Sequence, residues 1–252
     1  MKILSWNILA QEFIEPKYYP MIKSKLLKKR ADRILQIIRK IILYNPDVML
    51  LQEVMKEEYK IIKKVFSPKY FISENYPIYW ASEKDTNKLS ESGNITLVKK
   101  KLSSQVKFTI HSKKLPFVMT EFLYRHSKIN IINIHLDDQS NKNRLLQLKE
   151  ILSKMSNEIY VIIGGDFNEE YSKNNILYKY LKKNNLYPSI TKKSTYFIEK
   201  SMVIDNIMYK NFNLIKSKVH NGCGNRSIDN ITCQIKSYGS DHFPVISYLE
   251  II

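Results

Sequence analysis

Short apolar runs that end beside a carboxylate, amide or imidazole group constrain this sequence more than any other feature. The first run begins at Lys2 and reads as a strand that ends at Asn7. Residues 48–51 are wholly apolar, as expected of a strand buried on both faces, and Glu53 follows them. Further runs predict strands over 94–99, 118–124, 129–134, 160–163, 203–209 and 245–249.

Two stretches repeat apolar residues at helical spacing instead. The first covers 21–44 and stops at Asn45-Pro46-Asp47, and the second covers 143–155. Because helices alternate with strands, while several strands follow one another with only turns between them, the order predicts an α/β chain with mixed sheets and flanking helices. No repeat or Pro/Gly-rich linker divides residues 1–252, so we expect a single domain.

The charge of the chain indicates a polyanionic partner. The formal net charge is +17, from 41 Lys and Arg against 24 Asp and Glu. Such an excess attracts nucleic acid or an anionic membrane surface. The chain is also rich in Lys, Ile, Asn and Tyr, as AT-rich genomes tend to encode, so codon bias is an alternative source of part of the lysine.

Several features bear on the compartment. No apolar stretch reaches the roughly 18 residues of a spanning helix, and the N-terminal run is short and lacks a small-residue cleavage site. Cys223 and Cys233 form neither a disulfide framework nor a zinc site by themselves, and we expect two reduced thiols. We therefore expect an intracellular monomer, cytoplasmic or nuclear, without stable membrane insertion.

The polar groups beside the apolar runs form a chemically coherent set. In chain order they are Asn7, Glu53, His135, Asp166, Asn168, Asp205, Asp241 and His242. Carboxylate and amide oxygens suit Mg²⁺, whereas no Cys/His cluster suggests zinc. A bound cation offsets phosphate charge and helps to form an attacking hydroxide, and histidines donate to phosphoryl oxygens or protonate a leaving group. The set predicts hydrolysis of a phosphate ester.

Each group alone has a simpler explanation. Glu53 could begin a helix, Asp205 could be a surface acid, and His135 could be a satisfied core histidine. GGDFN could be a turn with glycine at positive φ, and SDH could be a cap before the last strand. The occurrence of all of them in this order favours one common site.

Together, the segments SWN, LQEV, GGDFN and SDHFPV resemble the endonuclease/exonuclease/phosphatase superfamily, and the resemblance covers residues 3–249. That superfamily includes pancreatic DNase, abasic endonucleases, tyrosyl-DNA phosphodiesterases, nocturnin-like deadenylases, inositol polyphosphate 5-phosphatases and neutral sphingomyelinases. The resemblance implies a four-layer α/β/β/α sandwich of two mixed sheets flanked by helices. It also implies Mg²⁺ as cofactor, with Mn²⁺ as a substitute.

The resemblance further implies a metal site and its ligands. Glu53 is implied as a direct metal ligand, with Asn7 in the same site. Asp241 is implied as a further acid near the metal.

The resemblance assigns the remaining strand-end groups to catalysis. Asp166 is implied as the residue that activates the attacking water, and Asn168 as its orienting partner or a phosphate contact. His242 is implied to contact the scissile phosphate, with Asp205 fixing its tautomer. His135 occupies a position that supports the leaving group or the transition state.

Weaker matches concern substrate binding. Asn94 in SGNITLV fits a substrate-side position. Arg144, with Gln147, matches an R-x-x-Q helix pattern that we interpret as mainly structural, and we keep Arg144 as a candidate for substrate binding. The pair Thr195-Tyr196 fits the family pattern loosely.

The choice of substrate depends on fewer residues. SWNILAQ is similar to the opening of nocturnin-like deadenylases, and YNPDVMLLQEV is similar to tyrosyl-DNA phosphodiesterases. We expect a nucleic-acid phosphodiesterase, with 3′–5′ exonucleolysis of RNA as the first hypothesis and an abasic endonuclease or 5′-tyrosyl-DNA phosphodiesterase as the alternative. Other classes are an inositol-phosphate phosphatase or sphingomyelinase, with the basic 21–44 stretch on a membrane surface, and an inactive binding module.

Overall fold

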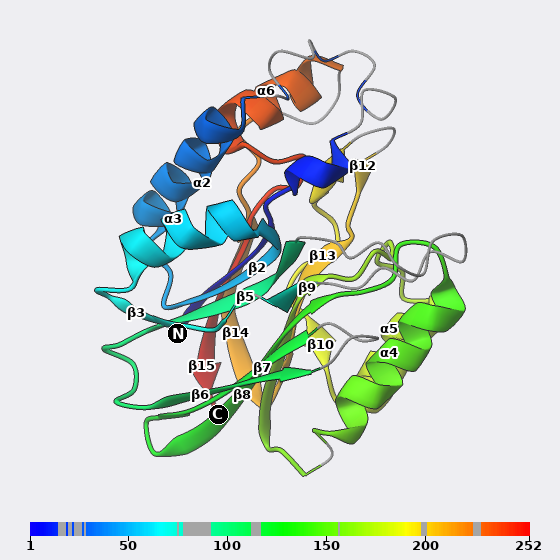
Figure 1. Ribbon diagram of the computed structural model, residues 1–252. Helices are drawn as coiled ribbons and strands as arrows, with labels where there is room; N and C mark the ends of the chain where they lie inside the picture. Colours follow the sequence, from blue (N-terminus) through cyan, green and yellow to red (C-terminus); the bar gives the residue numbers. More distant parts are fainter. Residues whose placement is uncertain are drawn as a thin grey trace.

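The computed structural model describes residues 1–14, 19, 22, 27, 29–74, 76–77, 92–111, 117–155, 157–197, 201–223 and 228–252. Two large β-sheets pack face to face, and helices cover the outer side of each sheet (Figure 1). This arrangement confirms the predicted four-layer α/β/β/α sandwich.

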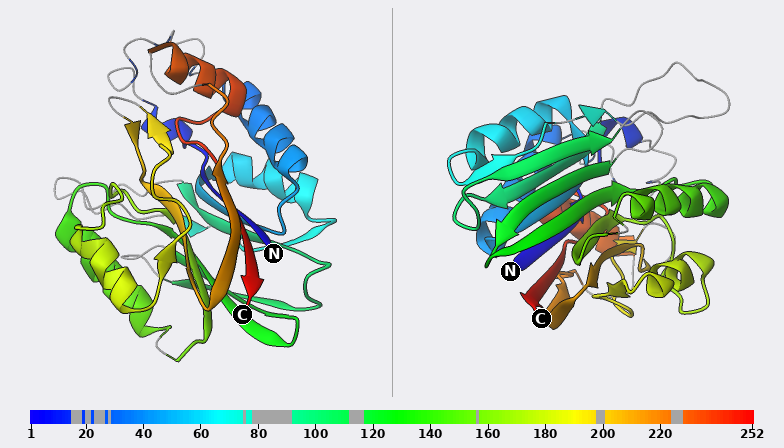
Figure 2. Two further views of the ribbon diagram at one scale, coloured as in Figure 1. Left: turned by 180° about the vertical axis from the view of Figure 1, so that it is seen from behind. Right: turned by 90° about the horizontal axis from the view of Figure 1, so that it is seen from below.

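The first sheet has seven strands in the order β14-β15-β1-β2-β5-β3, with β4 also paired to β5. β1 runs parallel to β2 and antiparallel to β15, so the carboxyl ends of β1 and β2 lie beside the amino end of β15. The N- and C-termini consequently lie close together (Figure 2). The strand bounds are β1 Lys2–Asn7, β2 Val48–Met55, β3 Tyr70–Ile72, β4 Tyr76–Pro77, β5 Ser92–Lys99, β14 Phe212–Val219 and β15 Val245–Ile251.

The second sheet has six strands in the order β10-β13-β9-β8-β7-β6. β8 runs parallel to β9, whereas β13 runs antiparallel to β9. A separate two-stranded sheet joins β11 (Tyr196–Phe197) to β12 (Ser201–Met202). The bounds in the large sheet are β6 Val106–His111, β7 Phe117–Tyr124, β8 Ser127–His135, β9 Tyr160–Asp166, β10 Tyr187–Pro188 and β13 Asp205–Lys210.

The helices divide between the two outer faces. α2 (Arg30–Tyr44), α3 (Lys56–Phe66) and α6 (Ile228–Tyr238) cover the first sheet, and α4 (Asn141–Ser153) and α5 (Ile176–Lys183) cover the second (Figure 1). A short 3₁₀ helix, η1 (Gln11–Phe13), follows β1.

The predicted 21–44 helix begins later than expected. α2 starts at Arg30, Ile22 and Lys29 lie outside it, and residues 21, 23–26 and 28 are outside the described residues. The apolar spacing identified the buried face, but Ile22 packs in a separate small cluster with Ile235. Asn45 ends α2 in the left-handed conformation with φ 46°, and its N–H bonds the carbonyl of Ile41 at 2.8 Å.

The structure also contains α3, α5, α6, β6 and β14, which the apolar patterns of the sequence did not predict. α3 is rich in Lys and Glu, and only Glu58, Ile62 and Phe66 among its residues are buried. β14 carries Lys216 and Lys218 and has mixed exposure along its length. Such elements are stabilised by packing on one face, so their local sequence gives a weak signal.

One apolar cluster fills the space between the sheets and continues to the first helical layer. It contains Leu50 of β2, Ile162 of β9 and Ile37 of α2. A second cluster joins the outer face of the second sheet to its helices through Ile163, Leu148 of α4 and Leu181 of α5. Burial of these side chains is the main stabilising contribution, at about 1.5–3 kcal/mol for each large apolar group.

A buried polar side chain links the two sheets. Asn133 of β8 donates to the carbonyl oxygens of Leu51 at 3.1 Å and Ile95 at 2.8 Å, which belong to the opposite sheet. Its Oδ1 accepts a hydrogen bond from Gln52 Nε2 at 2.6 Å. Asn133 and Gln52 have no exposed surface, so these bonds fix how the two sheets align.

The two glycines of GGDFN lie in β9, not in a turn as the simpler explanation required. A Cβ on Gly164 would meet Leu50 Cδ1 of the facing sheet at 2.5 Å. A Cβ on Gly165, which has φ 150°, would lie 1.9 Å from the carbonyl oxygen of Ile134 in β8. Gly165 needs to be glycine because backbone occupies the space of a Cβ, whereas at Gly164 the Cβ would meet the end of the Leu50 side chain, which can move.

Two further findings concern the compartment. Cys223 and Cys233 form a disulfide with a Cα–Cα distance of 5.8 Å, so the prediction of two reduced thiols is wrong. Cys223 follows β14 and Cys233 lies in α6, and the spacing of the two cysteines in the sequence does not show that these segments are in contact. Among the described residues, no helix is long and apolar enough to cross a membrane.

Candidate active site

Strand direction brings the predicted polar groups to one end of the sandwich. In the second sheet His135 is the register partner of Asp166, and Asp166 is the register partner of Asp205. Asp205 begins β13 rather than ending it, and it reaches the same edge because β13 is antiparallel to β9. In the first sheet Asn7 ends β1 opposite Gln52 of β2.

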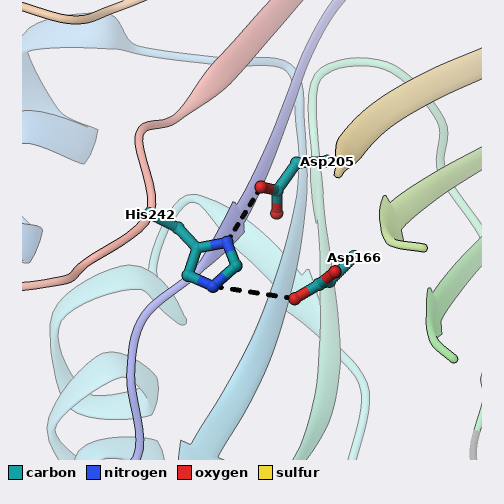
Figure 3. A group of neighbouring side chains, drawn as sticks. All are labelled: Asp166, Asp205 and His242. Carbon is teal, nitrogen blue, oxygen red and sulfur yellow. Dashed lines mark hydrogen bonds and ion pairs between the residues drawn. The ribbon is translucent and has the colours of Figure 1, made fainter. Parts of the chain in front are cut away.

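His242 lies between two carboxylates, one from each of two neighbouring strands (Figure 3). Its Nδ1 is 2.8 Å from Asp205 Oδ2, and its Nε2 is 3.7 Å from Asp166 Oδ2. Burial by itself lowers the pKa of His242, but the charges of Asp205 and Asp166 outweigh burial and hold the pKa well above its ordinary value. A protonated imidazole with Nδ1 bonded to Asp205 presents Nε2–H as a donor toward Asp166.

Main-chain contacts hold His242 in this position. Trp6 Nε1 donates to the carbonyl of His242 at 2.9 Å, and Ser240 Oγ accepts from the His242 N–H at 3.1 Å. Ser240 Oγ also donates to the carbonyl of Asn7 at 2.7 Å. The ring of Tyr196 lies 4.7 Å from the imidazole.

Glu53 lies in a β-bulge of β2. The register with β5 shifts between Leu51 and Val54, and Glu53 has φ 56°. Its Oε1 accepts from Asn7 Nδ2 at 2.6 Å, and its Oε2 accepts from the N–H of Ala10 at 2.8 Å. The bulge therefore directs Glu53 toward the end of β1, although the strand itself continues to Met55.

Asn7 connects the carboxylates of the two sheets. Its Nδ2 donates to Asp166 Oδ2 at 3.1 Å as well as to Glu53. Its Oδ1 accepts from the N–H of Leu9 at 3.0 Å. The carboxylates of Glu53 and Asp166 thus share one amide group between them.

His135 faces the same carboxylates but differs from His242 in charge. Its Nε2 is 3.7 Å from Asp166 Oδ2 and 4.0 Å from Glu53 Oε1. Burial, and then the charge of His242, lowers the pKa of His135 to about 3. His135 is therefore a neutral imidazole at physiological pH, whereas His242 is charged.

Asp241 adds a further buried carboxylate. Its Oδ2 accepts from the hydroxyl of Tyr19 at 2.9 Å, and its Oδ1 is 4.0 Å from His242 Nε2. Among the described residues Oδ1 of Asp241 is buried without a hydrogen-bond partner. A buried carboxylate oxygen without a donor is costly unless a cation or a ligand group binds it.

The donor set fits a divalent cation. Burial, and then the charge of Asp241, raises the pKa of Glu53 to about 7. Burial, and then the charge of Asp205, raises the pKa of Asp166 above its ordinary value. These acids resist joint ionisation when no cation is close, and hard carboxylate and amide oxygens are the ligands that Mg²⁺ prefers.

The residues that could hold the cation divide into two sets. Asp166, Asp205 and His242 bring one oxygen or nitrogen each within 4.8 Å of one another. However, Asp205 is already bonded to Nδ1 of His242, and a protonated imidazole is a poor ligand. The group of Glu53, Asn7 and Asp241 leaves that histidine–aspartate pair intact.

The other predicted residues lie around this centre. Asn168, with φ 48°, donates its N–H to Asp166 Oδ1 at 2.8 Å and its side chain to the carbonyl of Leu136 at 2.8 Å. Asn94 is a buried residue of β5. The guanidinium of Arg144 is 2.6 Å from Glu169 and donates to the carbonyl of Asp137 at 2.8 Å, so these contacts hold the α4 region rather than the strand-end acids.

Several side chains that support the site were not among the predicted residues. Tyr19 and Trp6 each make one side-chain hydrogen bond to a site residue, and Ser240 Oγ bonds both Asn7 and His242. Ser240 belongs to the SDH segment, so its proximity was available as a signal, whereas no local pattern distinguishes Tyr19. Thr195, noted only as a loose match, accepts from the N–H of Asp205 at 3.0 Å and fixes the start of β13.

Comparisons with known proteins agree with this fold. The family model described as the Endonuclease/Exonuclease/phosphatase family matches residues 4–242. A comparison with curated proteins gives no match. Among solved structures, ANGEL2, a 2′,3′-cyclic phosphatase, is similar with a TM-score of 0.78 and 15% identity, over 98% of this chain and 94% of that chain.

Two further structures are similar at comparable identity. The human nocturnin catalytic domain with bound sulfate has a TM-score of 0.67 and 16% identity, over 100% of this chain and 93% of that chain. A humanized D. rerio TDP2 has a TM-score of 0.66 and 17% identity, over 99% of this chain and 98% of that chain. These structures share the fold, and the family match spans nearly all of this sequence. The chain therefore belongs to the endonuclease/exonuclease/phosphatase family of phosphoesterases.

Proposed function

We propose that this chain is a Mg²⁺-dependent phosphodiesterase that acts on nucleic acid, with 3′–5′ exonucleolysis of RNA as its first candidate reaction. The observation that carries the proposal is the placement of His242. Asp205 holds Nδ1 at 2.8 Å, and Nε2 lies 3.7 Å from the carboxylate of Asp166. This neighbouring donor and acceptor suit a phosphoryl oxygen and an attacking water molecule that bind next to each other.

Each residue then has a distinct task in the proposed reaction. The Asp166 carboxylate takes a proton from the attacking water as the new phosphorus–oxygen bond forms and the bond from phosphorus to the leaving oxygen breaks. The Nε2–H of His242 donates to a non-bridging phosphate oxygen, where negative charge develops. The N–H of Asn168 donates to Oδ1 of Asp166 at 2.8 Å. This bond orients the carboxylate so that Oδ2 faces the imidazole of His242. Neutral His135, beside Oδ2, supports the leaving group.

Glu53, Asn7 and Asp241 would hold the cation. When bound, it would offset negative charge on the phosphate and on the leaving oxygen. Asn7 would keep its position through the N–H of Leu9, and Glu53 through the N–H of Ala10.

Charge and the similar structures support a nucleic-acid substrate. The net charge of +17 favours a polyanion, and some of the 17 Tyr and 10 Phe could stack on bases. TDP2 has been solved with a single-strand DNA product, and ANGEL2 with adenosine-2′,3′-vanadate. The latter complex adds a second candidate, hydrolysis of a 2′,3′-cyclic phosphate at an RNA 3′ end.

A substrate panel tests the proposal. The protein is incubated with Mg²⁺ and poly(A) RNA, RNA ending in a 2′,3′-cyclic phosphate, abasic duplex DNA, 5′-tyrosyl DNA, inositol polyphosphate and sphingomyelin. We expect turnover of an RNA substrate, loss of turnover with EDTA, and recovery on adding Mg²⁺. Turnover of the last two substrates alone would contradict the nucleic-acid assignment, and turnover of DNA alone would favour the repair alternative.

His242→Ala is the variant for the same panel. The lost donor should lower kcat by about 10²–10⁴-fold. Near-normal activity, with native circular dichroism, would contradict the role proposed for His242. His220→Ala is the matched control because His220 is only half-buried and lies beside Tyr44, with ring centroids 4.4 Å apart.

A further inference from the structure

Arg33 is a buried arginine of α2 that reaches the loops on both sides of the candidate site. It is 4% exposed. Its Nη1 donates to the carbonyl of Leu9 at 3.0 Å and to the carbonyl of Gly239 at 2.7 Å. Its Nη2 donates to Gln11 Oε1 at 3.2 Å. One nitrogen atom therefore joins the loop after Asn7 to the loop before Asp241 and His242.

The first of these loops has a strained conformation. Leu9 has φ 59°, a conformation that is strained for a residue other than glycine and persists only when neighbours hold it. In this conformation the N–H of Leu9 bonds Asn7 Oδ1 at 3.0 Å, and its carbonyl faces Arg33. Arg33 thereby stabilises the peptide that orients the Asn7 amide between Glu53 and Asp166.

The second loop approaches α2 so closely that only glycine fits. Gly239 has φ 79°, and a Cβ there would lie 2.4 Å from the carbonyl oxygen of Arg33. Two residues later Asp241 begins the segment that carries His242, and Ser240 between them bonds the carbonyl of Asn7. The two loops are thus joined in two ways. Ser240 bonds one loop to the other directly, and Arg33 of α2 bonds both.

The burial of Arg33 has a cost that its hydrogen bonds offset only in part. Burial lowers the pKa of Arg33, with opposing contributions from the charges of Glu58 and Asp241. Among the described residues Nε of Arg33 is buried without a partner, and Glu58 is bonded to Arg30 instead. Burying a guanidinium without a carboxylate partner is costly, and carbonyl oxygens compensate for only part of that cost.

We propose that Arg33 is a positioning residue, which fixes the spacing between the Asn7–Glu53 metal site and the Asp241–His242 segment. This inference rests on the proposed function only for its activity readout, because metal binding and the environment of His242 report on the same spacing without a substrate.

The test compares Arg33→Met, Arg33→Lys and the control Arg39→Met. Arg39 lies on the exposed face of α2, so its replacement makes the same chemical change without touching either loop. Arg33→Met should weaken Mn²⁺ binding, measured by electron paramagnetic resonance, on the order of 10-fold. It should also lower kcat on the order of 10²-fold with little change in KM.

Arg33→Lys should recover part of both losses, because a single ammonium nitrogen can still donate to the carbonyls of Leu9 and Gly239. The imidazole ¹⁵N resonances of His242 should shift in Arg33→Met and stay in place in Arg39→Met. If circular dichroism shows that Arg33→Met does not fold, Arg33→Lys is compared with wild type in the same measurements of Mn²⁺ binding, kcat and His242 resonances.

Two outcomes would overturn the inference. One is Mn²⁺ affinity and His242 resonances in Arg33→Met equal to those of wild type. The other is equal loss in Arg33→Met and Arg33→Lys together with equal loss of thermal stability, which would indicate a general fold defect. A wild-type protein without turnover on the substrate panel would refute the proposed function instead, and the two spectroscopic readouts would still decide on Arg33.

Discussion

At the scale of single residues, Asp205 explains why the two buried histidines, His135 and His242, differ in charge. Nε2 of each imidazole lies 3.7 Å from Asp166 Oδ2, and His242 in addition has Nδ1 2.8 Å from Asp205 Oδ2. The charge of Asp205 is the first of the effects that raise the pKa of His242 against burial. One acid thereby separates a charged donor from a neutral imidazole at the same carboxylate.

Asp205→Asn should therefore change both the rate and its dependence on pH. We expect kcat to fall by about 10²–10⁴-fold, because the imidazole loses the carboxylate that keeps it protonated and oriented. Activity that needs protonated His242 is lost as the pH rises through its pKa. Since the substitution lowers that pKa, the alkaline limb of the kcat/KM profile should move to lower pH. An unmoved limb, measured on any substrate found to turn over, would refute this role.

Glu53→Gln should act on the metal rather than on the proton transfers. Replacing one carboxylate oxygen by an amide nitrogen removes a ligand charge, so the Mg²⁺ concentration for half-maximal activity should rise on the order of 10- to 100-fold. Mg²⁺ should also raise the melting temperature of wild type more than that of the variant. Glu57→Gln is the matched control, because Glu57 is 56% exposed and pairs with Lys60 on α3. Identical Mg²⁺ titrations for wild type and Glu53→Gln would exclude Glu53 as a ligand.

At the scale of elements, strand direction explains why the polar groups stand where they do in the sequence. Asn7, His135 and Asp166 follow apolar residues because β1, β8 and β9 run toward the site. Asp205 and His242 precede apolar residues because β13 and β15 run away from it. Whether a polar site residue follows or precedes the apolar run of its strand thus indicates whether that strand runs toward the site or away from it.

Gly165→Ala tests the tightest contact between two of these strands. The new methyl group would lie 1.9 Å from the carbonyl oxygen of Ile134, which is a backbone atom of the adjacent strand and cannot move aside alone. We expect a loss in the free energy of unfolding of at least about 3 kcal/mol by urea titration. Gly222→Ala is the comparison, since its methyl group would meet only the hydroxyl of Tyr238, at 2.8 Å, and a side chain can adjust. Equal losses in the two variants would contradict this account.

The sequence predicted the strands that run through the core better than the elements on the surface. β2, β8 and β9 are buried on both faces over most of their length and contain runs of apolar residues, which identify them from the sequence. β14 and α3 bury one face only. The predicted strand over 48–51 ended too early because the bulge at Glu53, which depends on pairing with β5, is not visible in a single strand.

At the scale of the whole molecule, the excess of positive charge should act on long substrates. If the net charge of +17 serves to bind a nucleic-acid backbone, KM for poly(A) should rise at least about 10-fold between about 50 and 200 mM salt, because binding releases condensed counterions. KM for a dinucleotide, which carries one phosphodiester, should change little over the same range. Equal salt responses for the two substrates would indicate that the charge has no part in binding.

The residues of the candidate site were easier to predict than the side chains that hold those residues in place. All eight polar groups named from the strand ends lie at one end of the sandwich, because the residue types and their order already define the chemistry. Tyr19, Arg33 and Asn133 could not be identified from the sequence, since each acts through contacts with segments far away along the chain. The disulfide between Cys223 and Cys233 was missed for the same reason.

The bonds of Asn133 have a consequence for how this sequence can change over evolutionary time. Asn133 donates to two carbonyls of the opposite sheet and accepts from Gln52, and neither side chain has exposed surface. A substitution at either position alone would leave a buried amide without its partner. Homologues that lose the amide at 133 should therefore also lose the amide at 52, so the two positions should covary across an alignment even though neither contacts the phosphate.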